Sequence, residues 1–198
     1  MATPRKTTAK YRYRLRVELE GVTPVIWREI WVEGQMSLTQ LHHILQAAMG
    51  WTDAHLHQFT IAGKTYATPH PEDDSEREVI DERKVALHKV LNRDLQFHYD
   101  YDFGDSWRHL IRVEEVKPQT NPYGAAYVDA GARACPPEDS GGSGSYQDFL
   151  GDLKSRPKSK EVKSFLQWAG KDFDPDRFDR HAANAALLRM AWNHWGER

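Results

Sequence analysis

Residues 98–109 read His-Tyr-Asp-Tyr-Asp-Phe-Gly-Asp-Ser-Trp-Arg-His, and this stretch is the most informative in the chain. Aromatic and polar side chains alternate from Phe97 to Phe103, as they do in a strand whose successive side chains point to opposite faces. The alternation stops at Gly104, where Gly, Asp and Ser suit a tight turn, and it resumes at Trp107. The stretch predicts a central β-hairpin, with Tyr99, Tyr101 and Trp107 largely buried.

A second hairpin and one helix are predicted before this stretch. Residues 11–19 alternate between apolar and charged types, and residues 25–32 are rich in β-branched and aromatic types, so both segments favour strands. Ser37 and Gln40 have the spacing of a capping box. Apolar residues then recur every three or four positions until Gly50, which predicts a helix that ends there.

The remaining segments predict short strands, loops and further helices. Residues 55–61 and 64–67 flank Ala-Gly and favour a small hairpin, whereas residues 68–82 are acidic and polar and favour a surface loop. Other expectations are a helical turn at 84–91, an irregular segment at 117–126, a glycine-rich loop at 136–145, and helices at 146–153 and 161–169.

A last helix is expected to begin with Asp174 as N-cap and Pro175 at its first position. Its apolar stripe would comprise Phe178, Ala182, Ala185, Leu188, Ala191, Trp192 and Trp195.

This order of elements predicts an α+β fold, in which a mixed sheet of β-hairpins packs on one long helix and C-terminal helices follow. The order is also compatible with a β-grasp-like arrangement. We expect a flexible N-terminal segment at 1–9, an α+β domain at 10–155, and a helical extension at 156–198 that packs on that domain.

Composition narrows the class of protein. Of the 198 residues, 39% are hydrophobic and 28% charged, as in ordinary globular domains. The net charge of −2 excludes a globally basic nucleic-acid-binding protein. The single cysteine, Cys135, excludes an internal disulfide and a multi-cysteine zinc site. The N-terminus lacks an apolar stretch and no segment is long enough to span a bilayer, so we expect a cytoplasmic protein without a membrane partner.

The hairpin carries five groups able to bind a metal or transfer a proton: His98, Asp100, Asp102, Asp105 and His109. Carboxylates and imidazoles at alternate strand positions share a face and could hold one divalent ion. His109, however, is in phase with Trp107 and favours the core. The other interpretation of the hairpin is a solvated acidic face with a structural role.

Two further segments could contribute to a metal site. His55 and His57 have the spacing that places two imidazoles on one face of a strand. Glu138 and Asp139 form an acidic pair in a Pro- and Gly-rich loop and could share an ion with the hairpin. Each feature also has a structural interpretation, as packed histidines and as a rigid surface loop. His42 and His43 are weaker candidates, because adjacent helical residues diverge.

The first strand is basic. Arg12, Arg14 and Arg16 share one face and could contact nucleic-acid phosphates, while Tyr11 and Tyr13 point the other way and cannot act as stacking platforms beside them. A charged strand that discourages aggregation explains the same pattern. We expect weak nucleic-acid binding or none.

The motif Tyr-Asp-Phe-Gly-Asp-Ser-Trp-x-His at 101–109 resembles the hallmark of the plasmid pRiA4b ORF-3-like family. Other matching pieces occur in the expected order: Val25-Ile26-Trp27-Arg28, Leu41-His42, Met49-Gly50-Trp51, His55-Leu56-His57-x-Phe59, Cys135-Pro136-Pro137-Glu138-Asp139-x-Gly141-Gly142 and Phe173-Asp174-Pro175. The resemblance covers nearly the whole chain. It implies an association with plasmids and transposable elements, where members are often described as transposon passenger proteins under a resolvase name. It implies no established activity.

The leading hypothesis is therefore a non-enzymatic accessory protein that binds another protein. The alternative is a metal-dependent hydrolase or nuclease that uses the acidic hairpin and the Pro-Pro-Glu-Asp loop. Resolvase chemistry is rejected, because the chain shows no nucleophilic serine among arginines and its C-terminal helices lack a basic recognition face.

Overall fold

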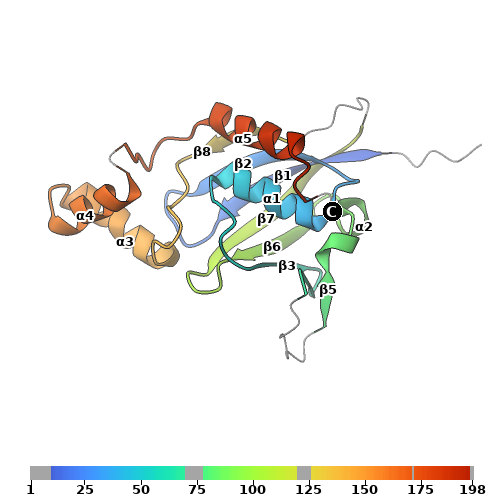
Figure 1. Cartoon of the computed structure of the whole chain (residues 1–198), viewed down its shortest axis with the longest axis horizontal. Helices are drawn as coiled ribbons and strands as arrows, with labels where there is room; N and C mark the ends of the chain where they lie inside the picture. The colour runs from blue at the N-terminus through green and yellow to red at the C-terminus, as the bar shows by residue number, and fades with distance from the viewer. Residues whose placement is uncertain (1–9, 70–77, 120–125, 171, 197–198) are drawn as a thin grey trace, which may run out of the picture.

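The computed structural model describes residues 10–69, 78–119, 126–170 and 172–196, and it confirms the α+β fold. Its described strands form one sheet in the order β5-β4-β3-β6-β7-β1-β2-β8 (Figure 1). Neighbouring strands are antiparallel except β4 and β5, which are parallel. The strands are β1 Tyr11–Leu19, β2 Ile26–Glu33, β3 His57–Ile61, β4 Lys64–Ala67, β5 Val79–Asp81, β6 Gln96–Tyr101, β7 Trp107–Pro118 and β8 Tyr127–Ala132.

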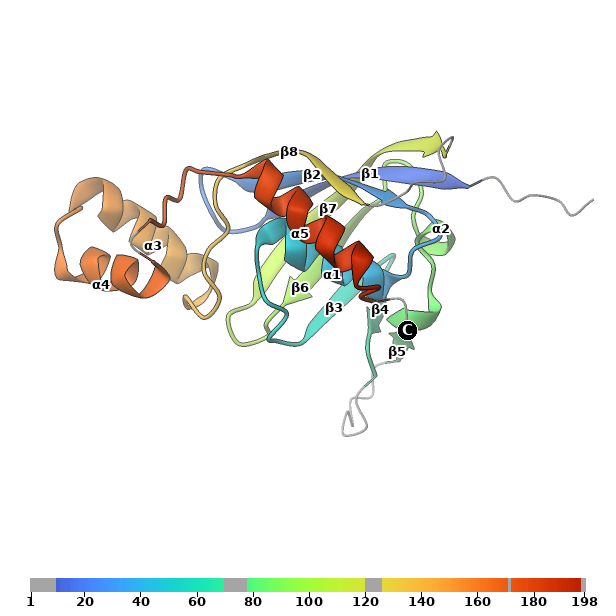
Figure 2. The ribbon, with the colours of Figure 1, turned by 45° about the horizontal axis from the view of Figure 1, so that its top comes forward.

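Helices cover one face of this sheet and extend beyond one end of it. The helix α1 lies against the sheet, and α5 runs beside α1 and over β8 (Figure 2). The helices α3 and α4 pack on each other at the end of the molecule away from α2 and β5 (Figure 1). The helices are α1 Leu38–Met49, α2 Leu87–Val90, α3 Gly142–Ser155, α4 Lys160–Ala169 and α5 Arg180–Trp192, with a 3-10 turn at Glu82–Lys84.

The hairpin β6–β7 is central, as its sequence predicts. Tyr99 faces His109 and Tyr101 faces Trp107 across the two strands. Tyr99, Tyr101 and Trp107 are all at most 1% exposed, so the predicted aromatic face is the buried one. Polar residues on the other face remain half-buried, among them Asp100. The hairpin thus forms the floor on which α1 packs.

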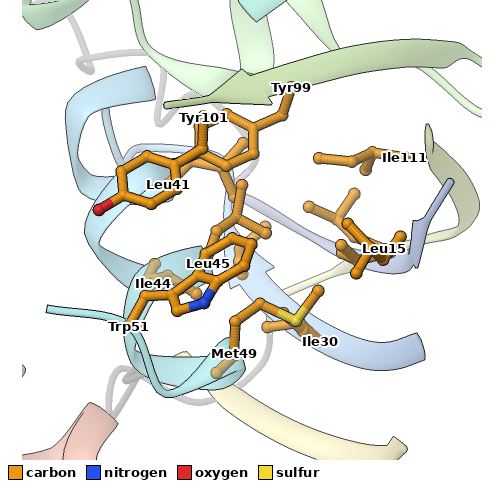
Figure 3. Packing of buried hydrophobic residues seen from close by; sticks show 14 of the residues in the cluster. Leu15, Ile30, Leu41, Ile44, Leu45, Met49, Trp51, Tyr99, Tyr101 and Ile111 are labelled. Carbon is orange, nitrogen blue, oxygen red and sulfur yellow. The ribbon is translucent and has the colours of Figure 1, made fainter. Parts of the chain in front are cut away.

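The core lies between α1 and the sheet. Leu41, Ile44 and Leu45 of α1 point toward the strands and meet Leu15 and Ile30, with the Trp51 ring closing one end (Figure 3). The capping box predicted for this helix is present: the Gln40 backbone N–H donates to Ser37 Oγ at 3.1 Å, and the Ser37 N–H donates to Gln40 Oε1 at 2.9 Å. Gly50 ends the helix in the left-handed conformation that favours glycine, at φ 97°.

Several segment predictions were wrong. The expected loop at 68–82 contains β5, which pairs in parallel with β4, and no strand was predicted at 127–132, where β8 pairs with β2. Both strands are edge strands of three to six residues, too short to show clear alternation. The helix α3 begins at Gly142, within the expected loop. The expected flexible segment at 1–9, and residues 70–77 and 120–125 of the two expected loops, lie outside the described residues.

The last helix begins later than predicted. Asp179, not Asp174, caps α5, and its side chain accepts from the Ala182 N–H at 2.9 Å. Asp174 instead closes a small turn by accepting from the Asp176 N–H at 3.0 Å. The later start changes which residues face inward. Those that α5 buries are Ala183, Leu187 and Met190 rather than the predicted stripe.

One contact of α5 closes the end of the sheet. Asn184 Oδ1 accepts from the Val128 N–H at 2.8 Å, and its Nδ2 donates to the Val128 carbonyl at 2.9 Å. Both backbone groups of this β8 residue are therefore satisfied by a side chain. In the described ranges, no helix is long and apolar enough to cross a membrane.

Candidate functional site

The turn of the central hairpin fixes one carboxylate. Asp102 follows β6 in the left-handed region, at φ 55°, and its backbone N–H donates to the Leu56 carbonyl at 2.9 Å. Its Oδ1 accepts from the N–H groups of Gly104 and Asp105, at 2.9 and 3.3 Å. These bonds hold the carboxylate in one orientation, in which Oδ2 lies toward His55.

The loop at residues 136–141 lies beside this turn. Its Gly141 N–H donates to Asp105 Oδ2 at 2.9 Å. A side chain at Gly142 would place a Cβ 2.4 Å from the Asp105 carbonyl oxygen, so this close approach of two loops requires glycine. The loop carrying Glu138 and Asp139 is therefore on the same side of the sheet as Asp102 and Asp105.

Glu138 anchors this loop to the core. The Tyr101 hydroxyl donates to Glu138 Oε1 at 2.5 Å, and the Thr52 N–H donates to Oε2 at 3.0 Å. Burial and the Glu138 hydrogen bond raise the pKa of Tyr101 well above its usual value. Trp51 adds a second anchor, because its Nε1 donates to the Pro136 carbonyl at 2.9 Å. Both carboxylate oxygens of Glu138 therefore accept hydrogen bonds that hold the loop in place.

Three side chains from three segments converge here, and we call them the open cluster: His55, Asp102 and Asp139. His55 Nε2 lies 3.1 Å from Asp139 Oδ1 and 3.6 Å from Asp102 Oδ2. The Asp139 side chain is 69% exposed, so the cluster opens to solvent. His55 Nε2 itself is buried, yet it makes no hydrogen bond of acceptable geometry with any described residue. The arrangement concentrates potential metal ligands.

The hairpin residues on the polar strand face lie elsewhere. Asp100 is on the opposite face of the sheet, where it lies 3.6 Å from Arg108 and accepts from Gln58 Nε2 at 3.2 Å. His98 shares that face and lies 3.9 Å from Glu20. His98 and Asp100 therefore lie across the sheet from the loop of Glu138 and Asp139, with which the hairpin residues could have shared an ion. Asp102 leaves the strand alternation because the chain turns at its left-handed backbone.

His109 is a core residue, the placement that its phase with Trp107 favours. It is 1% exposed, and its ring lies edge-on to Trp51, with 5.4 Å between ring centroids. Neither ring nitrogen makes a hydrogen bond of acceptable geometry with a described residue, although backbone groups of Tyr99 and Trp107 lie close to the ring. Burial lowers the pKa of His109 to about 4, so the ring is neutral at physiological pH.

A second group of histidines and carboxylates lies across Tyr99, and we call it the closed cluster: His42, His43, Asp53, His57 and Glu82. The rings of His42 and His57 stack in parallel with 3.5 Å between centroids. His42 Nε2 contacts Asp53 Oδ1 at 2.6 Å, and His57 Nε2 contacts both Glu82 oxygens at 3.0 and 3.1 Å. His57 thus does not join His55, although the two are only two residues apart.

The hydrogen bonds of the closed cluster define its protons. Gln46 Nε2 donates to the Tyr99 hydroxyl, which leaves that hydroxyl to donate to His42 Nδ1 at 2.8 Å. His42 Nε2 therefore carries the ring hydrogen and donates it in a hydrogen bond to Asp53 Oδ1. Burial lowers the pKa of His42 despite Asp53, whereas the hydrogen bonds from His42 and His43 outweigh burial and hold the pKa of Asp53 well below its usual value.

Sequence reasoning missed the closed cluster, although a signal exists. His42 follows Leu38 by four positions and precedes Leu45 by three, so it belongs to the buried face of α1. A histidine on a buried face requires polar partners. The sequence does not identify them, because Asp53 lies in the loop before β3 and Glu82 in the 3-10 turn after β5, with three strands between them.

A cavity of about 290 Å³ adjoins the closed cluster. It lies between α1 and α5, with Asp53 and Trp51 on one side and Met190 and Trp195 on the other. Most of its lining is apolar. Trp195 is 57% exposed, and its ring lies edge-on to His43 of α1, with 6.5 Å between the ring centroids.

The predicted nucleic-acid contacts Arg12, Arg14 and Arg16 each have a partner within the protein. Arg16 lies 3.1 Å from Glu18 and stacks over Trp27, 3.6 Å from the ring centroid. Arg14 lies 3.5 Å from a glutamate on β7, and Arg12 stacks over Trp31. Internal partners thus already occupy these guanidinium groups.

Cys135 does not form a nucleophilic site. It packs against the core, and burial raises the pKa of its thiol to about 12, despite the neighbouring Arg28. A thiol at that pKa supplies almost no thiolate at neutral pH.

Comparison with known proteins assigns the chain to a family. Residues 11–182 match the family described as plasmid pRiA4b ORF-3-like protein, and the chain belongs to that family. It is 35% identical over 180 residues to the uncharacterized protein y4hQ of Sinorhizobium fredii, covering 90% of this chain and 89% of that protein. Its fold matches the crystal structure of MM3350, a protein of unknown function from Methanosarcina mazei Go1, with a TM-score of 0.79 and 34% identity. That match covers 89% of this chain and 98% of the other.

Proposed function

We propose that this protein is a non-enzymatic accessory protein that binds a protein partner through the outer face of α5. The observation that carries the proposal is the exposure of large apolar side chains on this helix. Trp192 is 85% and Leu188 63% exposed, and they are four residues apart and so share one helix face. The inner face of α5 is separately filled by Ala183, Leu187 and Met190. Exposed apolar patches of this kind are typical of interaction surfaces.

The charges around this face favour a partner of a particular chemistry. Between residues 180 and 195 the sequence carries Arg180 and Arg189 but no acidic residue. An apolar surface with acidic residues at its rim would complement this helix in both shape and charge. The family takes its name from a plasmid reading frame, which supports a partner encoded by a plasmid or transposable element.

The test compares two exposed tryptophans. Trp192→Ser should abolish recovery of a specific partner by affinity purification from the native host, because tryptophans dominate interface energetics. Trp168→Ser is the matched control, since Trp168 is 53% exposed but lies on α4. Equal recovery with Trp192→Ser and the native chain would contradict the proposal. A native chain that sediments as a dimer while Trp192→Ser is monomeric would identify a second copy as the occupant instead.

A second candidate function is a metal-dependent hydrolase, favoured by the convergence of Asp102 and Asp139 on His55. Three protein ligands and open solvent positions are the arrangement in which an ion activates water. Hydrolysis of single- or double-stranded nucleic acid in the presence of Mn²⁺, abolished by Asp139→Asn, would support it. Full activity in Asp139→Asn would exclude it.

A further inference from the structure

We propose that the open cluster is a binding site for one divalent transition-metal ion, with His55, Asp102 and Asp139 as ligands. The inference concerns metal binding only. It stands independently of partner binding at α5 and of any hydrolytic activity.

Ligand spacing is the first argument. Zinc and related ions bind histidine nitrogen and carboxylate oxygen at about 2.0–2.2 Å. Two ligands of one such ion are then separated by roughly 3.0 Å in octahedral and 3.5 Å in tetrahedral geometry. The separations in the open cluster are 3.1 Å from His55 Nε2 to Asp139 and 3.6 Å to Asp102, with all three ligand atoms within 4.8 Å. An ion therefore fits between them with small movements.

The second argument is the unsatisfied imidazole nitrogen. His55 Nε2 is shielded from solvent and lies within ion-pair distance of both carboxylates, yet it makes no hydrogen bond of acceptable geometry with either or with another described residue. Buried polar atoms normally have partners. A metal ion at the junction of the two carboxylates would take the nitrogen lone pair and satisfy all three groups.

The third argument is that the surroundings hold the ligands in place. One oxygen of Asp102 is occupied by two backbone N–H groups, which leaves the other for an ion. Asp105 fixes the loop of Asp139 through Gly141, and Glu138 anchors it to Tyr101. Such supporting hydrogen bonds orient ligands in known metal sites.

The donor set indicates the class of metal. One imidazole and two carboxylates suit Zn²⁺, Mn²⁺ or a similar ion better than Ca²⁺ or Mg²⁺, which favour oxygen ligands alone. The exposure of Asp139 leaves coordination positions for water.

The closed cluster is a poorer site even though its ligand atoms are near one another. His42, His43 and Asp53 lie within the same limit as the open cluster. However, both nitrogens of His42 are already hydrogen-bonded, and both Asp53 oxygens contact imidazoles. A metal there would have to displace bonds that the protein already makes.

The experiment is isothermal titration of the full chain, without an affinity tag, with ZnCl₂ and with MnCl₂. We expect one ion per chain, and we expect Asp139→Asn and His55→Gln to weaken binding by at least roughly tenfold, as loss of weaker outer contacts already does in known sites. Asp100→Asn and His98→Gln are matched controls on the opposite face of the sheet and should bind as the native chain does. Thermal unfolding without metal should show that Asp139→Asn, a change at an exposed side chain, remains folded.

Three results would overturn the proposal. The first is no saturable binding of either ion. The second is native affinity in Asp139→Asn and His55→Gln. The third is binding that His43→Gln abolishes and Asp139→Asn preserves, which would assign the ion to the closed cluster.

Discussion

The open and closed clusters contain the same kinds of residues and differ in how those residues are satisfied. They flank Tyr99 and Tyr101, neighbours on one face of β6. In the closed cluster, Tyr99, Asp53 and Glu82 complete the hydrogen bonding of two stacked histidines. In the open cluster, His55 Nε2 lies within ion-pair distance of two carboxylates and makes a well-formed hydrogen bond to neither. Residue types alone therefore do not distinguish a structural hydrogen-bond network from a candidate binding site. The two differ in whether each buried polar atom is hydrogen-bonded.

The largest expected effect tests the hairpin β6–β7, which carries Tyr99 and Tyr101. Trp107 is fully buried opposite Tyr101 and lies beside Trp51. Trp107→Ala should lower the free energy of unfolding by about 3–5 kcal/mol, because it removes a large buried ring and leaves a cavity. Urea denaturation measures this loss. Trp192→Ala, at an exposed ring, should change stability by no more than about 0.5 kcal/mol. A small loss at Trp107 would show that the hairpin is not the centre of the core.

The next effect is acid destabilisation through His109. Its folded pKa of about 4 lies below the ordinary value of 6.5, so the unfolded chain binds the proton more readily. Stability is then complete above about pH 6.5 and falls as the pH drops toward 4, by at most about 3 kcal/mol. His109→Leu should remove this part of the pH dependence while keeping stability near neutral pH within about 1 kcal/mol, because two buried nitrogens without well-formed hydrogen bonds are also removed. Parallel urea denaturation near pH 7 and near pH 4.5 measures both. Identical pH profiles for the two chains would contradict the assigned environment.

The next and smaller effect compares the stability cost of one substitution in each cluster. Glu82→Gln alters a side chain that is 0% exposed and accepts from His57 and Thr68, and it should cost about 1–3 kcal/mol. Asp139→Asn in the open cluster should cost less than about 0.5 kcal/mol without metal. Thermal unfolding of both variants measures the contrast. Equal costs would remove the distinction between a structural and a binding cluster.

The smallest expected effect concerns the arginines of β1. Because Arg12, Arg14 and Arg16 already have internal partners, the triple alanine variant should leave nucleic-acid affinity unchanged. Fluorescence anisotropy with labelled duplex DNA over a series of salt concentrations measures this. A reduced slope of affinity against salt would show that these groups release counterions from phosphate after all.

Local patterns were sufficient to predict much of the fold. The period-two alternation of β1 and β6 and the capping box of α1 depend only on neighbouring residues, and all three are present. The edge strands β5 and β8 were missed because strands this short are defined by their neighbours in the sheet rather than by their own pattern. The start of α5 was misplaced because Asp174 and Asp179 are both suited to capping, and the local sequence does not decide between them.

The candidate site could likewise be predicted only in part from local sequence patterns. Asp102, Asp139 and His55 were each candidates from their own segments, but only the approach of the turn to the loop at 136–141 brings them together. Alternation wrongly grouped Asp102 with Asp100, since it assumes that the strand continues through residue 102. The left-handed backbone at that residue turns its carboxylate to the other side.

The bonds from Asn184 to Val128 have a consequence for how copies of this chain meet. The unpaired N–H and C=O groups of an edge strand can pair with a strand of another molecule. Chains that pair in this way aggregate or exchange segments. A single amide side chain occupies both groups of Val128, and α5 lies over the strand that they belong to. The helix that carries the exposed Trp192 therefore also withholds these two backbone groups of β8 from pairing with the strand of another copy.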